Sequence, residues 1–313
     1  MPVSDLTIFI SSCDKNSDLW PVFFRNLSAK WPSSRELPVV LNAETLDYSY
    51  PGYDIVCPAV CAEGDKEMPW STRFLKALES VKTEYCYLVL EDFLLPHPVD
   101  EAKFGEFMDE IRGTKDFGCC YFCAAHSRYP NFPVEGKKFF LSVNRYSDYK
   151  ADLSPGLWKT ALLRKLVKPG LNIWQAELVM RDRSYKLWRK EKYFTLSQYD
   201  FDKTPLYQKE IPERQAVCYD FRMQLVKGKW VPALVGFLKS EGIDADFEKR
   251  GIIEHDFDVN AKSNVDAAER ELKKGYKHLT RYFRLHNHII PSLSRIKWRF
   301  IAIFTGNNKA AYK

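Results

Sequence analysis

The hydrophobic pattern of the chain is most regular between residues 70 and 95. Tyr85 to Leu90 is an unbroken apolar run of six residues, rich in aromatic and branched side chains. A run of that length predicts a strand buried on both faces, as in the middle of a parallel sheet. Just before it, residues 70–81 place apolar side chains at positions i, i+1 and i+4, which predicts a helix with one buried side.

The rest of the first 260 residues alternates in the same way between short apolar runs and helical spacing. We expect strands at residues 6–13, 37–42, 53–60, 118–125, 138–145 and 194–197, and helices at 18–29, 99–111, 158–167 and 231–238. Residues 128–136 and 199–213 contain several prolines and are predicted to be irregular. The alternation predicts the α/β class: one domain over residues 1–260, with a mostly parallel central sheet flanked by helices.

Polar residues follow two of the predicted strands at the point where each strand ends. Glu91 and Asp92 come directly after the apolar run, and Ser11, Ser12 and Asp14 come at the end of the first strand. In open α/β sheets, ligands bind beyond the carboxyl ends of the strands, so these side chains are candidates for a ligand site, with Ser11, Ser12 and Asp14 at the nucleoside end. The alternatives are that the acids begin an ordinary loop, and that the residues after the first strand cap the following helix.

Arg73 lies near the start of the predicted helix 70–81, beside Lys76 on the helix surface. An arginine and a positive helix end suit the phosphates of a nucleotide diphosphate, while Glu91 and Asp92 would face its ribose or a divalent metal. His97 could join a metal shell, but a histidine between two prolines is more often a loop residue. The chain contains neither G-x-G-x-x-G nor G-K-[ST], which argues against a dinucleotide site or a P-loop.

Two motifs in this region resemble a known family. The sequence W-S-x-R-x-x-x-A-L at residues 70–78, followed by E-Y-x-x-L-x-L-E-D-F at 84–93, is similar to the core of glycosyltransferases with a GT-A fold. More narrowly, it resembles a set encoded in bacterial capsule and O-antigen clusters. In the wider family the strand ends in a metal-binding D-x-D signature, whereas here Phe93 takes the place of the second acid. The resemblance therefore implies that any Mn²⁺ or Mg²⁺ is held weakly, through Asp92 and the phosphates of the donor.

A second block resembles the same set. It reads P-x-x-W at residues 155–158 and N-x-W-x-x-E at 172–177, a stretch that lies on the acceptor side of the cleft in that set. The resemblance implies that Glu177, which ends this stretch, is the catalytic base. We expect Asn172, Trp174 and Glu177 on one face of a short helix. For Trp174, core packing is the favoured interpretation, and stacking of the indole on a sugar ring is the alternative.

The resemblance implies a glycosyltransferase that moves a sugar from a nucleotide-sugar donor to a polysaccharide or a lipid-linked glycan. Arg73 would neutralise the departing diphosphate, and Glu91 or Asp92 would bind ribose or metal. Glu177 would remove the proton from the acceptor hydroxyl if the reaction inverts configuration. The alternative from another class is a non-catalytic nucleotide- or glycan-binding protein on the same fold, because fold alone does not give function.

Charge is unevenly distributed along the chain. The net charge is +6, but residues 261–313 hold twelve Lys or Arg against three Asp or Glu, a local charge of +9 that leaves −3 for residues 1–260. After Pro291, apolar residues follow helical spacing among basic ones. We therefore predict a helical basic extension that binds an anionic membrane surface, with packing on the body as the open alternative. Nucleic acid is not favoured as a partner, because the body is acidic and contains no recognised binding motif.

The expected compartment is the cytoplasm. Residues 1–5 lack the basic region of a signal peptide, and no apolar run approaches the roughly 18 residues that a membrane helix requires. The eight cysteines are therefore expected to be reduced, and the protein to be peripheral at the inner membrane face if the extension binds there. Cys120 and Cys123 have the C-x-x-C spacing, but they fall in a predicted strand, so core packing is favoured over a metal site.

Overall fold

The computed structural model describes residues 5–61, 68–122, 132–143, 150–187, 192–196, 199–200, 209–210 and 225–254. The predicted basic extension at 261–313, including its apolar stripe, lies outside the described residues. Within the described ranges, no helix is both long and apolar enough to cross a membrane.

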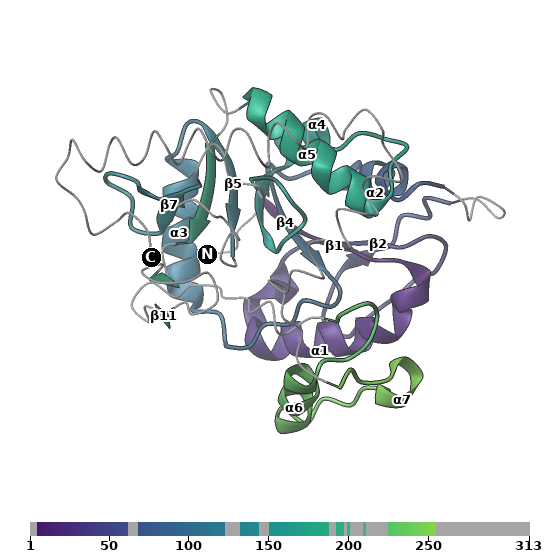
Figure 1. The fold of residues 1–313 in the computed structure, drawn as a ribbon. Helices are drawn as coiled ribbons and strands as arrows, with labels where there is room; N and C mark the ends of the chain where they lie inside the picture. Colours follow the sequence, from purple (N-terminus) through teal and green to yellow (C-terminus); the bar gives the residue numbers. More distant parts are fainter. Residues whose placement is uncertain are drawn as a thin grey trace.

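The central feature is one nine-stranded sheet with strand order β3-β2-β1-β4-β8-β5-β9-β7-β6 (Figure 1). Its strands are β1 (Leu6–Ser11), β2 (Val39–Asn42), β3 (Ile55–Val56), β4 (Tyr85–Leu90), β5 (Phe117–Tyr121), β6 (Phe132–Pro133), β7 (Phe140–Ser142), β8 (Gly156–Lys159) and β9 (Lys192–Leu196). A separate antiparallel pair is formed by β10 (Tyr199–Asp200) and β11 (Lys209–Glu210). The helices are α1 (Trp20–Lys30), α2 (Trp70–Leu78), α3 (Glu101–Arg112), α4 (Thr160–Leu166), α5 (Ile173–Leu187), α6 (Pro232–Ser240) and α7 (Phe247–Arg250), with 3₁₀ turns at Asp14–Leu19 and Pro32–Glu36.

Most of the sheet is parallel. Strands β3, β2, β1 and β4 pair in parallel, and β5 pairs in parallel with β9. Strand β8 runs antiparallel between β4 and β5, which leaves those two strands pointing the same way. The antiparallel strands β7 and β6 complete one side of the sheet. The predicted α/β class, with a mostly parallel sheet flanked by helices, is confirmed.

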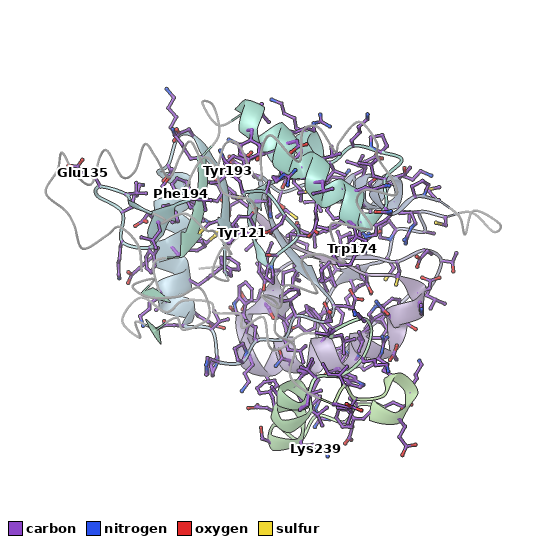
Figure 2. The ribbon with its side chains drawn as sticks, in the orientation of Figure 1. Tyr121, Glu135, Trp174, Tyr193, Phe194 and Lys239 are labelled. Atoms are coloured by element: carbon purple, nitrogen blue, oxygen red, sulfur yellow. The ribbon has the colours of Figure 1, made fainter. Side chains whose placement is uncertain are left out.

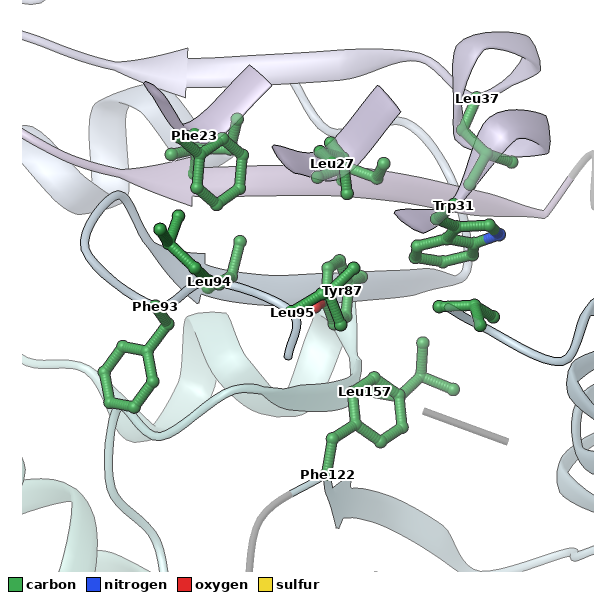
Figure 3. Packing of buried hydrophobic residues seen from close by; sticks show 14 of the residues in the cluster. Phe23, Leu27, Trp31, Leu37, Tyr87, Phe93, Leu94, Leu95, Phe122 and Leu157 are labelled. Atoms are coloured by element: carbon green, nitrogen blue, oxygen red, sulfur yellow. The ribbon is translucent and has the colours of Figure 1, made fainter. Parts of the chain in front are cut away.

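Strand β4 lies inside the sheet because both of its faces are apolar. Tyr85, Tyr87 and Val89 pack into the core layer that contains α1, α3 and α6, whereas Cys86 and Leu88 pack against α2, α4 and α5. Figure 3 shows the first layer, where Phe23 and Leu27 of α1 and the ring of Tyr87 lie on the same side of the sheet. This two-sided burial is the one that the apolar run predicted, and the bounds of β4 match that run.

The region around β8 corrects the sequence interpretation. A helix was expected from Trp158, but residues Gly156–Lys159 form a strand and the helix begins at Thr160. Gly156 is required by a close approach rather than by a turn, since a Cβ there would lie 2.8 Å from the backbone oxygen of Cys120 in β5. The short helix expected at 172–177 is the beginning of the 15-residue α5. Part of the segment expected to be irregular, residues 132–133, forms β6.

The connections bring several helix and strand ends to one side of the sheet. Strands β1, β2 and β4 all end there, and α2, which precedes β4, begins there; we call this side the carboxyl end of the sheet. The first turn of α2 is joined to the segment before α5, because the Ser71 amide donates to the Leu171 carbonyl at 3.0 Å and the Leu171 amide donates to Ser71 Oγ at 2.8 Å. The two sequence blocks, 70–93 and 155–177, therefore meet at the carboxyl end.

Candidate functional site

The loop after β1 is held to the loop after β2 by Asp14. Its carboxylate accepts hydrogen bonds from the Glu44 amide at 2.8 Å, from the Thr45 amide at 3.1 Å and from the Thr45 hydroxyl at 2.6 Å. Burial acts to raise the pKa of Asp14, but these hydrogen bonds prevail and lower it. The Asp14 side chain is thus engaged by its own chain. Of the other two residues proposed for the nucleoside, Ser11 is buried and Ser12 accepts a hydrogen bond from the Trp20 indole at 2.8 Å.

Arg73 lies in the first turn of α2 and is 8% exposed. Its guanidinium forms an ion pair with the carboxylate of Glu44, and the second carboxylate oxygen of Glu44 accepts the amide N–H of Asp14. Sequence reasoning missed Glu44. It follows β2 as Glu91 follows β4, so the rule that drew attention to one strand end also applied to the other.

Glu91 is buried directly beyond β4, where the side-chain amide of Asn16 donates to its carboxylate. Burial and the neighbouring Asp92 carboxylate raise the pKa of Glu91. Burial also raises the pKa of the Cys13 thiol to about 11, and the negative charges of Glu91 and Glu44 add to that shift. The charges of both carboxylates therefore act on Cys13. The structure brings the Arg73–Glu44 pair and Glu91 to the same short stretch of the carboxyl end.

Asp92 has different surroundings from Glu91. It borders a small hollow whose other lining residues are Leu19, Val22, Glu91, Leu94, Leu225, Trp230 and Leu234. Burial in this mostly apolar place raises the pKa of Asp92, against a hydrogen bond from the Leu225 backbone. Phe93, which stands where a D-x-D signature would have its second acid, is part of the core.

A metal cage is not formed by these residues. Within the described ranges, no three His, Cys, Asp or Glu side chains come close enough to hold a metal ion together. His97, the other proposed metal ligand, lies exposed in the loop after β4. The donor set of this part of the chain therefore fits at most a metal that a phosphate-bearing ligand brings with it.

The C-terminal part of the described chain adds a second arginine to the site. Arg250 of α7 donates to both carboxylate oxygens of Asp18, at 2.8 and 2.6 Å, and to the side-chain oxygen of Asn16 at 3.1 Å. Burial acts to raise the pKa of Asp18, but Arg250 lowers it. Asn16 thus links Arg250 to Glu91. No local pattern could have revealed this, because Arg250 and Asn16 are 234 residues apart in the sequence.

Near the start of α5, Glu177 and Asp152 form a second carboxylate pair, in which the Asp152 charge acts on Glu177. The Leu153 amide donates to Glu177 at 3.3 Å, and the Ser154 amide donates to Asp152 at 2.9 Å. Burial raises the pKa of Asp152 to about 6. Burial also raises the pKa of Glu177 to about 8, and the Asp152 carboxylate adds to that shift. Sequence reasoning identified Glu177 but missed Asp152.

Two contacts fix the elements that hold this pair. The Tyr121 hydroxyl donates to the Lys150 carbonyl and accepts the Asp152 amide, both at 3.1 Å, so β5 supports the loop before β8. At the start of α5, the Gln175 amide donates to the side chain of Asn172 at 2.9 Å, and the Asn172 amide donates back to the side chain of Gln175 at 3.2 Å. This reciprocal cap fixes the first turn of α5, and Glu177 lies directly after that turn.

Trp174 corrects a prediction. Core packing was favoured for it, but its side chain is 64% exposed, while Ala176 and Met180 of the same helix are fully buried. Figure 2 shows it at the end of α5 that lies beside α2. Trp174 and Glu177 are three residues apart and therefore neighbours on the helix surface, whereas Asn172 precedes the helix and caps it. The alternative use of the indole, stacking on a sugar ring, remains a prediction.

Comparison with known proteins gives only distant similarities. No family model matches this chain, and no curated protein matches it. It is similar to the crystal structure of S. aureus TarS 1–349, with a TM-score of 0.43 and 12% identity over 64% of this chain and 59% of that one. Against the same protein in complex with UDP-GlcNAc the TM-score is 0.42 and the identity 14%, over 64% of this chain and 57% of that one. A crystal structure described as a mycobacterial protein gives a TM-score of 0.39 and 8% identity, over 62% of this chain and 65% of that one.

Proposed function

We propose that this protein is a glycosyltransferase, which moves a sugar from a nucleotide-sugar donor to a polysaccharide or a lipid-linked glycan. One observation carries the proposal. Arg73, Glu91 and Glu177, to which the GT-A resemblance gives the diphosphate, the ribose and the acceptor hydroxyl, come from distant parts of the sequence to the carboxyl end of one sheet. That end is where open α/β sheets bind their ligands.

Each of the three residues has surroundings that suit its proposed role. Arg73 is a buried cation, and a fixed positive charge stabilises a diphosphate most strongly as it departs. Glu91 is held in place by Asn16 and can present an oxygen to a ribose hydroxyl. Glu177 has a pKa raised to about 8, which matches a general base that works near neutral pH.

A second candidate is a nucleotide- or glycan-binding protein without catalysis. Three observations favour it: Arg73 is already paired with Glu44, Asp92 borders a mostly apolar hollow, and Phe93 occupies the place of an acid. The effect of replacing Glu177 distinguishes a binding protein from a transferase. A binding protein keeps its ligand and shows no reaction for Glu177 to influence, whereas a transferase loses turnover when Glu177 loses its basicity.

The experiment that tests the proposal is a thermal-shift screen of nucleotides and nucleotide sugars, with and without Mn²⁺, followed by an assay for release of the nucleoside diphosphate. A donor that binds the native state must raise its stability. We expect such a rise for the wild type and for Arg25→Gln, a control at an exposed arginine of α1, but not for Arg73→Gln. If no nucleotide raises the melting temperature, or if Arg73→Gln responds like Arg25→Gln, the proposed donor site is wrong.

A membrane-bound acceptor is proposed from the sequence of the C-terminal extension, which lies outside the described residues. The extension has a charge of +9, and each basic residue near an anionic surface contributes about 1 kcal/mol of attraction that salt screens. We expect the full chain to sediment with anionic vesicles at low salt and to be released at high salt. A full chain that ignores such vesicles would rule out this part of the proposal.

A further inference from the structure

The side-chain carboxylate of Glu44 lies where a positive charge and a backbone N–H group could also bind another anion. One of its carboxylate oxygens meets the guanidinium of Arg73, and the other accepts the amide N–H of Asp14. A buried guanidinium and a backbone amide are the donors that proteins use to receive phosphate oxygens. A carboxylate has two oxygens in one plane and one negative charge, so it can stand in for one edge of a phosphate group.

The backbone of Glu44 is held independently of its side chain. The Asp14 carboxylate accepts the amides of Glu44 and Thr45, and the Glu44 carbonyl accepts the Cys61 amide at 3.2 Å. The loop after β2 therefore stays in place if the carboxylate leaves. The side chain of Glu44 is also the more accessible member of the ion pair, with 18% of its surface exposed against 10% for Arg73. A rotation of one side chain towards solvent is enough to open the site.

We propose that Glu44 is an internal substitute for the ligand phosphate, and that a diphosphate binds Arg73 and the Asp14 amide by displacing it. The inference rests on the proposed function only in taking the diphosphate to be that of a nucleotide sugar. While the site is empty, Glu44 keeps the buried cation of Arg73 paired, which avoids the large cost of an isolated buried charge. When a diphosphate arrives, it supplies more negative charge and more acceptor oxygens than the carboxylate it replaces.

This arrangement predicts a weaker apparent affinity than the open site would have. If the site binds only while Glu44 is turned away, the apparent dissociation constant is the intrinsic one divided by the open fraction. The carboxylates of Glu91 and Asp14 lie nearby, and they repel an anion. An anion without strong contacts to Arg73 therefore binds weakly. The device therefore selects ligands that can satisfy Arg73 and the amide together.

The test uses inorganic pyrophosphate as the probe, titrated into the full chain by calorimetry. Four variants are compared with the wild type: Glu44→Gln, Arg73→Gln, both changes together, and Glu79→Gln. Glu79 is the matched control, because it is an exposed acid at the other end of α2. Glutamine keeps the shape of Glu44 but removes the charge that pairs with Arg73. We expect Glu44→Gln to bind pyrophosphate about tenfold more tightly than the wild type, which corresponds to an open fraction of about one tenth.

Glu79→Gln is expected to bind like the wild type, and both variants that lack Arg73 are expected not to bind. If Glu44→Gln binds no more tightly than Glu79→Gln, the ion pair is a structural contact and the inference fails. It also fails if neither the wild type nor Glu44→Gln binds pyrophosphate. Circular dichroism of the double variant shows whether the chain still folds. Pyrophosphate binding that follows this pattern while no nucleotide sugar reacts would leave the anion site standing and refute only the proposed transferase.

Discussion

The two carboxylate pairs at the carboxyl end of the sheet differ in how firmly the rest of the molecule holds them. Glu91 and Asp92 are neighbours in sequence; Glu91 is bonded to Asn16, which Arg250 fixes in turn. Asp152 and Glu177 come from a loop and a helix, and each accepts a backbone amide. Burial raises the pKa of all four. Glu91 is thus part of a polar network with Asn16 and Arg250, whereas Asp152 and Glu177 are each held by one backbone amide.

This difference in support suggests different roles for the two pairs, one in ligand binding and one in acid–base chemistry. A network that satisfies its polar atoms keeps side chains in one geometry, which suits the binding of a ligand. A carboxyl with a raised pKa and little support from charged partners can take up and release a proton near neutral pH, which suits acid–base chemistry. On this view the Glu91 pair positions the ligand, and the Glu177 pair takes part in proton transfer. The predictions below test that division, beginning with the largest expected effect.

The strongest test is Glu177→Gln, which keeps the shape of the side chain and removes its basicity. We expect turnover to fall by about 100- to 10,000-fold, the usual range for loss of a general base. The measurement is the rate of nucleoside diphosphate release at saturating donor, with binding of the donor checked separately. Glu79→Gln, an exposed acid outside the site, is the control and should leave the rate unchanged. Near-normal turnover in Glu177→Gln would make Glu177 a structural carboxyl and remove the difference between the pairs.

The pH dependence sharpens the same point. Because Glu177 must be ionised to act as a base, transfer should rise with pH through its pKa of about 8. Asp152→Asn removes a negative charge that raises this pKa, so the rising limb of the kcat/KM profile should move to lower pH. The stability effect has the opposite sign: with a folded pKa above the unfolded value of 4.5, the stabilisation from Glu177 is lost as pH rises from about 4.5 to 8. A profile that Asp152→Asn leaves in place would contradict the coupling.

The sequence predicted the arrangement of these residues better where it depends on strand ends than where it depends on long-range contacts. The apolar run of β4 placed Glu91 and Asp92, and the rule for parallel sheets brought Arg73 to the same end. Asp152 was missed because a single acid in a loop has no pattern, and its pairing with Glu177 exists only after folding. Arg250 was missed for the same reason, since an α-helical turn far along the chain supplies it.

Local signals also failed where two principles compete. The spacing of residues 158–167 predicts a helix from Trp158, but Gly156–Lys159 form β8, and Gly156 permits its close packing on β5. Core packing was predicted for the indole of Trp174 from the general behaviour of tryptophan, but the side chain is 64% exposed in the first turn of α5. Such choices depend on which neighbours the fold supplies, and a single sequence does not contain that information.

The network around the first pair predicts a stability effect. Arg250→Gln removes a guanidinium whose side chain is 9% exposed and leaves Asp18 without its main partner. We expect a loss of about 2 kcal/mol in the free energy of unfolding, measured by urea denaturation. Lys249→Gln is the matched control: its ammonium lies 3.5 Å from the same carboxylate, but the side chain is 54% exposed, so its loss should be below about 0.5 kcal/mol. Equal effects would show that Arg250 makes only a surface contact.

The exposed indole beside the second pair predicts a smaller, ligand-dependent effect. If Trp174 stacks on a sugar ring of the acceptor, Trp174→Ala should raise the acceptor KM by about three- to tenfold, the equivalent of one aromatic contact. The melting temperature and the donor affinity should not change, because the side chain is 64% exposed. Val56→Ala, at another exposed apolar residue on β3, is the control. An unchanged acceptor KM would leave Trp174 outside the site.

The smallest effect is expected for Asp92→Asn. The direction in which this change moves the melting temperature decides whether Asp92 is a metal ligand. Burial raises the pKa of Asp92 above its ordinary value of 3.8, so the folded state favours its protonated form. Its contribution to stability is therefore present at acidic pH and is lost as pH rises to neutral. Asp92→Asn keeps an oxygen that can accept the Leu225 amide and removes the charge. We expect a higher melting temperature than wild type at pH 7.5, no difference near pH 4, and unchanged transfer in the presence of a chelator.

Asp54→Asn, at an exposed aspartate, should show no such pH-dependent gain. A variant at Asp92 that loses both stability and Mn²⁺-dependent transfer at pH 7.5 would instead make Asp92 a metal ligand.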